Sequence, residues 1–151
     1  MADIVHRIGI KAPMAQVHAA LATIPGLSGW WTSDTTGSAQ EGGNVVFTFK
    51  TPAGDTKGQM NFKVNQVTPN SIKWTCAEGP EEWIGTNATF DMSTADDMTI
   101  LIFGHRNWKE QSEGCAHCSM KWATFLLSLR SYVETGKGMP SPNDLKIDNW
   151  N

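Results

Sequence analysis

The sequence is poor in cysteine, in runs of positive charge and in long apolar stretches, and each shortage argues against a class of protein. The 3 cysteines, Cys76, Cys115 and Cys118, are too few and odd in number for a disulfide framework. The 12 lysines and arginines form no basic run and are outnumbered by 15 acidic residues, which leaves a net charge of -3. Because phosphate binding needs a basic face, we do not expect a nucleic acid as partner.

The apolar segments are also too short for a membrane protein. No stretch approaches the roughly 18 apolar residues that a membrane-spanning helix needs. Residues 1–16 contain neither the apolar region nor the cleavage pattern of a signal peptide. We therefore expect a cytoplasmic protein with no membrane span, and a length of 151 residues suits a single domain.

Periodicity along the chain predicts strands in its first and central parts. Alternating apolar residues indicate a strand at 3–11, followed by a helix that Pro13 opens and a short helix or turn around Trp30 and Trp31. Residues 32–43 are polar and predict a loop. The period then changes to two, which predicts five further strands joined by short turns, at residues 44–50, 59–67, 71–76, 83–92 and 98–105.

A long amphipathic helix is predicted at the end of the domain. Ser112 or Glu113 is the candidate cap, and an apolar stripe runs from Cys115 to Val133. Gly136 suits the left-handed position that ends a helix. About 22 helical residues span roughly 33 Å, enough to cross a sheet. The chain is therefore expected to be an α+β protein in which about six antiparallel strands are covered by this helix.

Two terminal motifs carry a resemblance to a known family. The stretches "IKAPMAQVHAALATIPGLSGWWT" and "HCSMKWATFLLSLRSYVETGKGMPSPND" resemble the SRPBCC superfamily of START-like and birch-pollen-allergen-like proteins, and most of all the homologues of the heat-shock-protein ATPase activator. The resemblance implies a helix-grip domain over residues 1–140 with a tail at 141–151. It also implies a cavity between a curved sheet and the C-terminal helix, where members of the superfamily bind lipid-like or aromatic molecules.

Seven tryptophans are the most unusual feature of the composition. Aromatic side chains combine a large apolar area with a polar edge, which suits an amphipathic ligand, although they also fill cores. Strand parity and the resemblance together predict that the cavity is lined by large apolar side chains and one histidine. The candidate ligand-binding residues are Trp30, Trp31, Phe47, Phe49, Met60, Phe62, Trp74, Phe103, His105, Trp122 and Phe125.

His105 is the candidate polar anchor of that cavity. It shares the parity of Leu101 and Phe103 at the end of the last strand, so it either faces the cavity or reaches water. The pair Cys115 and Cys118 lacks the further ligands of a zinc site, and both are expected to be reduced and to pack as small apolar groups. We expect neither a metal nor a cofactor, and no catalytic residue is assigned because no catalytic motif is present.

Three hypotheses for the function follow from these patterns. The first is binding of a small hydrophobic or amphipathic ligand between the sheet and the C-terminal helix. The second is a co-chaperone-like module that binds a protein partner, with an exposed Trp31 or Trp108 as the anchor. The sequence leaves open whether the long helix also pairs between two copies in a homodimer. The third is a cyclase-like or hydrolase-like enzyme that uses His105 with a nearby carboxylate.

Overall fold

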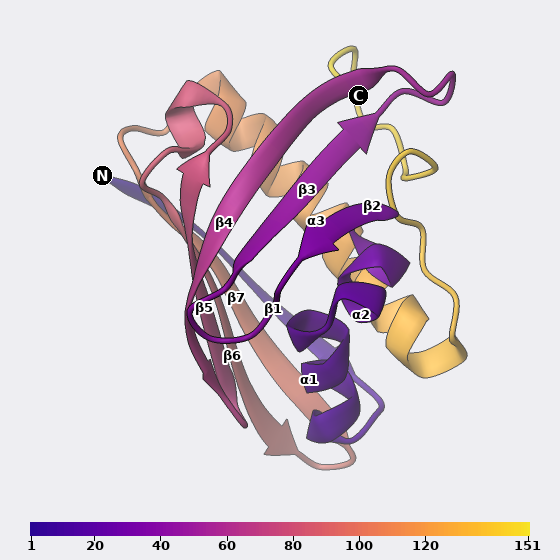
Figure 1. Ribbon diagram of the computed structural model, residues 1–151. Helices are drawn as coiled ribbons and strands as arrows, with labels where there is room; N and C mark the ends of the chain where they lie inside the picture. Colours follow the sequence, from indigo (N-terminus) through magenta and orange to yellow (C-terminus); the bar gives the residue numbers. More distant parts are fainter.

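The computed structural model describes residues 1–151, and it confirms the α+β class and the long closing helix. Two short helices separate the first strand from the others (Figure 1). The elements are β1 (Ala2–Ile10), α1 (Met14–Ala22), α2 (Ile24–Trp30), β2 (Asp34–Gly37), β3 (Asn44–Lys50), β4 (Thr56–Thr68), β5 (Ser71–Glu78), the 3-10 helix η1 (Glu81–Trp83), β6 (Asn87–Ala95), β7 (Met98–Trp108) and α3 (Glu113–Thr135).

The strands form one antiparallel sheet of seven strands in the order β1-β7-β6-β5-β4-β3-β2. The sheet curves around α3, and α1 and α2 fill one end of the space between them (Figure 1). Alternate residues face this space, as the period of two predicts: Met60, Phe62 and Val64 of β4 are buried, whereas Gln59 and Lys63 are exposed. No helix is long and apolar enough to cross a bilayer.

Two local expectations were wrong. Residues 34–37, expected within a loop, form the edge strand β2, which pairs with β3 although its sequence is polar. The strand expected to begin at Trp83 begins at Asn87, because Glu81–Trp83 form a 3-10 helix and Gly85 adopts a φ of 85°. This turn sends Trp83 inward, where it is 9% exposed, and leaves Ile84 at 56% exposure.

The ends of α3 form as the sequence predicts. The Ser112 hydroxyl accepts a hydrogen bond from the Cys115 amide, and Gly136 ends the helix with a φ of 82°. Trp122, Phe125 and Leu129 are buried on the face toward the sheet. Lys121 is only 9% exposed although it is charged, because the segment that follows α3 folds back over it.

Residues 141–151 pack against the domain. Ser141 forms a bridge with Thr32, and its amide donates to the Trp31 carbonyl at 2.7 Å. The segment then runs back along α3 toward the far end of β3 and β4 (Figure 1, yellow). The division into a domain of residues 1–140 and a tail stays a prediction, but the tail contributes to the site described below.

Candidate functional site

Aromatic side chains fill most of the space between the sheet and α3. The Trp31 ring lies 4.1 Å from that of Phe47 and 4.8 Å from that of Trp122, measured between centroids. It also stacks on Trp74 with an interplanar angle of 8°. Trp31 and Trp108 are each 1% exposed, so neither is the exposed anchor expected for a protein partner. Much of the predicted lining is therefore packed core.

His105 lies within this packed region rather than at a free surface. Its exposed fraction is 0%, which shows that it faces the interior. The Trp122 indole donates to His105 Nδ1 at 3.0 Å, and His105 Nε2 lies 2.8 Å from the Thr86 hydroxyl. The Thr86 hydroxyl in turn donates to the Trp83 carbonyl at 2.5 Å. Both nitrogens of the ring are thus occupied within the protein.

These contacts define the tautomer of His105. Since Nδ1 accepts from Trp122, the proton lies on Nε2, which donates to Thr86. Burial lowers the pKa of His105 from 6.5 to about 3, because the desolvated ring cannot be charged at low cost. A neutral ring with both nitrogens bonded has no free group for a ligand or a proton transfer. We therefore leave His105 out of the candidate site.

One pocket of about 280 Å³ remains between α3 and the sheet. Of the eleven residues predicted to bind a ligand, five line it: Trp31, Phe49, Met60, Trp122 and Phe125. The other six lie elsewhere in the core: Trp30, Phe47, Phe62, Trp74, Phe103 and His105. Trp30, for example, is held at the junction of the helices, where its indole donates to the Ala20 carbonyl at 2.8 Å.

Nine further residues line the pocket that sequence reasoning did not include. They are Lys57, Gly58, Pro80, Trp83, His117, Cys118, Lys121, Trp150 and Asn151. The tryptophans among them, Trp83 and Trp150, were available signals. Trp150 lies beyond the end of α3 in the sequence and reaches the pocket only through the fold of the tail. The polar residues carry no local pattern that marks them. Only the packing of the tail against α3 and β4 brings them together.

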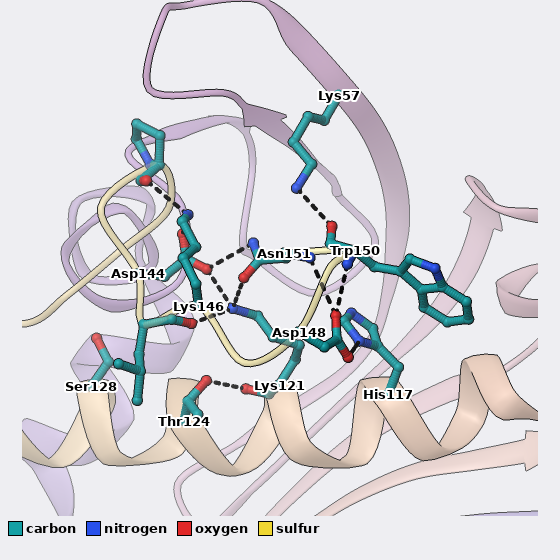
Figure 2. A network of polar contacts seen from close by, with 12 residues as sticks. Lys57, His117, Lys121, Thr124, Ser128, Asp144, Lys146, Asp148, Trp150 and Asn151 are labelled. Atoms are coloured by element: carbon teal, nitrogen blue, oxygen red, sulfur yellow. Dashed lines mark hydrogen bonds and ion pairs between the residues drawn. The ribbon is translucent and has the colours of Figure 1, made fainter.

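A buried ion pair holds the tail on α3 (Figure 2). The Lys121 ammonium donates to Asp144 at 2.5 Å, to the Leu145 carbonyl at 2.8 Å and to the Asn151 side chain at 2.6 Å. These three contacts use all the donors of the lysine. Burial raises the pKa of Asp144, but hydrogen bonds from Lys121 and Lys146 outweigh it, so the pKa lies below its ordinary value.

The end of the tail forms one wall of the pocket. His117 Nδ1 lies 2.6 Å from a carboxylate oxygen of Asp148, and the His117 and Trp150 rings are 5.2 Å apart. From the opposite side, Lys57 Nζ of β4 donates to the Trp150 carbonyl at 3.3 Å (Figure 2). The tail therefore bridges α3 and β4 across the mouth of the pocket.

The cysteines near the pocket are suited to packing rather than chemistry. Cys118 lines the pocket, and burial raises the pKa of its thiol to about 12. The thiolate is the reactive form of cysteine, so this group is inert at neutral pH. All three cysteines are free, and no group of three His, Cys, Asp or Glu side chains is placed to hold a metal ion.

Comparison with known proteins gives matches among solved structures only, since no protein-family model and no curated protein matches the chain. The Aha1 dimer from Colwellia psychrerythraea, solved in solution, matches with a TM-score of 0.81 at 40% identity, over 91% of this chain and 100% of that one. A Mesorhizobium loti protein matches with a TM-score of 0.74 at 16% identity, over 88% of this chain and 97% of its own. CalU16 from Micromonospora echinospora matches with a TM-score of 0.69 at 18% identity, over 89% of this chain and 77% of its own.

The last two matches show the fold alone, and together with the sheet, the closing helix and the pocket they define a helix-grip protein. The match at 40% identity to the whole of the Colwellia protein goes further: the chain belongs to the Aha1 family. The resemblance drawn from the two terminal motifs is thereby confirmed.

Proposed function

We propose that this protein binds a small, largely apolar molecule in the pocket between α3, β4 and the tail. The observation that carries the proposal is a pocket of about 280 Å³ with eight hydrophobic residues among its fourteen. Pockets for small molecules hold about 300–1,000 Å³ and combine apolar walls with a few polar groups. The volume here lies just below that range, which favours a compact ligand of two or three rings.

Gly58 offers a way to fill the pocket without disturbing the fold. It faces the pocket on β4, and a Cβ built on it meets no atom within 4 Å. Its φ lies outside the left-handed region, so a side chain causes no backbone strain. A leucine at this position should therefore occupy ligand space and leave the core unchanged.

The test uses N-phenyl-1-naphthylamine, a neutral probe whose fluorescence rises in an apolar site. We expect the wild-type protein to bind it and Gly58→Leu to weaken binding by at least about tenfold. Lys63→Leu is the matched control, because Lys63 lies exposed on the same strand and does not line the pocket. Absence of binding to the wild type, or equal binding to both variants, would refute the proposed site.

Self-association is a second proposed property, supported by two observations. The Colwellia relative is a dimer in solution. In this chain α3 and the segment that follows it expose Leu127 at 49%, Met139 at 52% and Leu145 at 57%, and these three side chains line one hollow. Exposed apolar surface of this kind marks interaction sites.

Sedimentation velocity tests the second proposal. We expect a dimer for the wild-type protein and a monomer for Leu127→Glu, which places a charge in the hollow. Lys63→Glu, on the sheet face remote from α3, should remain dimeric. A monomeric wild type at concentrations where the pocket is assayed would overturn the proposal.

A further inference from the structure

The charged side chains that line the pocket are the lysines Lys57 and Lys121, with His117 beside them. Asp144 and Asp148 pair with Lys121 and His117, but no aspartate or glutamate side chain lines the pocket. This is unexpected in a chain whose net charge is -3. A pocket with cationic groups at its mouth and aromatic walls behind them is complementary to a ligand with one anionic end.

Lys57 is the cation that remains open to a ligand. Lys121 is already paired with Asp144 and has no free donor. Lys57, in contrast, takes part in none of the ion pairs of the protein and contacts only the Trp150 carbonyl, at 3.3 Å. It is exposed at the mouth of the pocket, where two of its three donors have no partner within the protein.

An irregularity of the sheet coincides with this lysine. Phe49 pairs with Gly58, but the next residue of β3, Lys50, pairs with Thr56, so Lys57 is the extra residue of a β-bulge. Simple alternation along β4 would place Lys57 with exposed Gln59 and Lys63, away from the pocket. Bulges increase local twist and re-aim side chains, which accounts for the approach of Lys57 to the pocket.

The two lysines also repel one another. Lys57 contributes to lowering the pKa of Lys121, after the larger effects of burial and of Lys146, so the two ammonium groups are close enough to interact. An anion seated beside Lys57 would relieve this repulsion and would replace the long contact to the Trp150 carbonyl. The existing ion pair between Lys121 and Asp144 would stay intact.

We infer that the ligand of this pocket is an aromatic or short-chain monoanion, with its apolar body between the aromatic walls and its anionic group beside Lys57. The inference rests on the proposed function, since it assigns the chemistry of the ligand at the same site. Carboxylate and sulfonate share the required charge. A neutral or cationic molecule of the same shape binds less tightly, because it forms no ion pair with Lys57 at the mouth of the pocket.

Calorimetric titration with three compounds that share one ring system tests the inference: 2-naphthoate, 2-naphthamide and naphthalen-2-ylmethanamine. We expect naphthoate to bind about fivefold more tightly than the amide, the effect of one partly exposed ion pair, and the cationic amine to bind most weakly. Added salt should weaken only the preference for the anion, because it screens the charge of Lys57.

Two variants assign the effect to a residue. Lys57→Met keeps an apolar stem and should remove the preference for naphthoate over naphthamide. Lys63→Met removes the same charge from the same strand outside the pocket and should preserve the preference. An equal effect of the two variants would show that the overall charge of the protein sets the preference for the anion, and it would overturn the assignment to Lys57.

The remaining outcomes separate the two proposals. Equal binding of all three compounds to the wild type would overturn the anionic preference while leaving the pocket as a binding site. Failure of all three compounds and of the neutral naphthylamine probe would overturn the proposed function itself. Tighter binding of the amine would reverse the sign of the inferred ligand charge.

Discussion

The space between the sheet and α3 contains two neighbouring regions, which differ in whether their polar side chains have partners within the protein. Around His105, each nitrogen of the ring has a partner inside the protein, and the surrounding indole rings leave no opening. Around Lys57, an ammonium group faces a pocket with a single long contact to a carbonyl. A cation without a protein partner beside a void is available to a ligand, whereas a buried polar group with all its partners inside the protein serves the structure.

The comparison predicts that His105→Ala has the largest effect on stability. The substitution leaves a cavity and removes the partners of the Trp122 indole and the Thr86 hydroxyl. We expect the free energy of unfolding to fall by about 3 kcal/mol. Urea denaturation measures it, and His117→Ala, a half-buried histidine near the pocket, should cost less. A loss of unfolding free energy no larger than that of the control would show that His105 is not part of the packed region.

The neutral His105 predicts a dependence of stability on pH. The folded pKa of about 3 lies below the ordinary value of 6.5, so between these values the unfolded chain binds a proton that the folded protein does not. This contribution to stability is complete above pH 6.5 and is lost as the pH falls toward 3, by about 1.4 kcal/mol per pH unit.

Urea denaturation from about pH 7 to about pH 4 checks this dependence. The quantity to compare is the slope of the free energy of unfolding against pH. Subtracting this slope for His105→Gln from that for the wild type isolates the contribution of the histidine, because both proteins share the other titrating groups. Parallel slopes for the two proteins would show that His105 is not held neutral by the fold.

Two tryptophans of the packed region sharpen the comparison. The Trp122 indole donates to His105, whereas the buried Trp108 indole N–H has no partner. Both tryptophans lose similar volume when replaced by phenylalanine, but only Trp122→Phe leaves a buried acceptor unsatisfied. We expect Trp122→Phe to cost about 1–2 kcal/mol more than Trp108→Phe in urea denaturation. Equal costs would mean that packing alone, without the hydrogen bond, accounts for the region.

The smallest effect is expected in the open region. Gly58→Leu should change the free energy of unfolding by less than about 0.5 kcal/mol, because the new side chain enters empty space. The same urea measurement decides it. A loss approaching that of His105→Ala would show that the pocket closes around Gly58 in solution, and the contrast between the two regions would disappear.

Features that depend on neighbouring residues could be predicted from the sequence, whereas features that depend on residues distant in the chain could not. The cap at Ser112, which was one of two candidates, the stop at Gly136 and the buried parity of β4 depend on neighbours in the chain, and the sequence predicts them. The strand β2 was missed because its polar sequence pairs only once β3 is in place. Trp83 was placed in a strand because alternation cannot reveal the 3-10 turn at residues 81–83.

The sequence by itself determined the fold class and the family, because both depend on periodicity and on terminal motifs that a linear chain displays. Tertiary structure alone decided which aromatic residues border a void and which fill the core. It brought Lys57, Lys121 and Asn151 to one pocket by folding the tail across α3. The pattern of apolar residues in the sequence shows which side chains are interior. A void depends on how many side chains from distant segments pack together, so no single segment of the sequence reveals it.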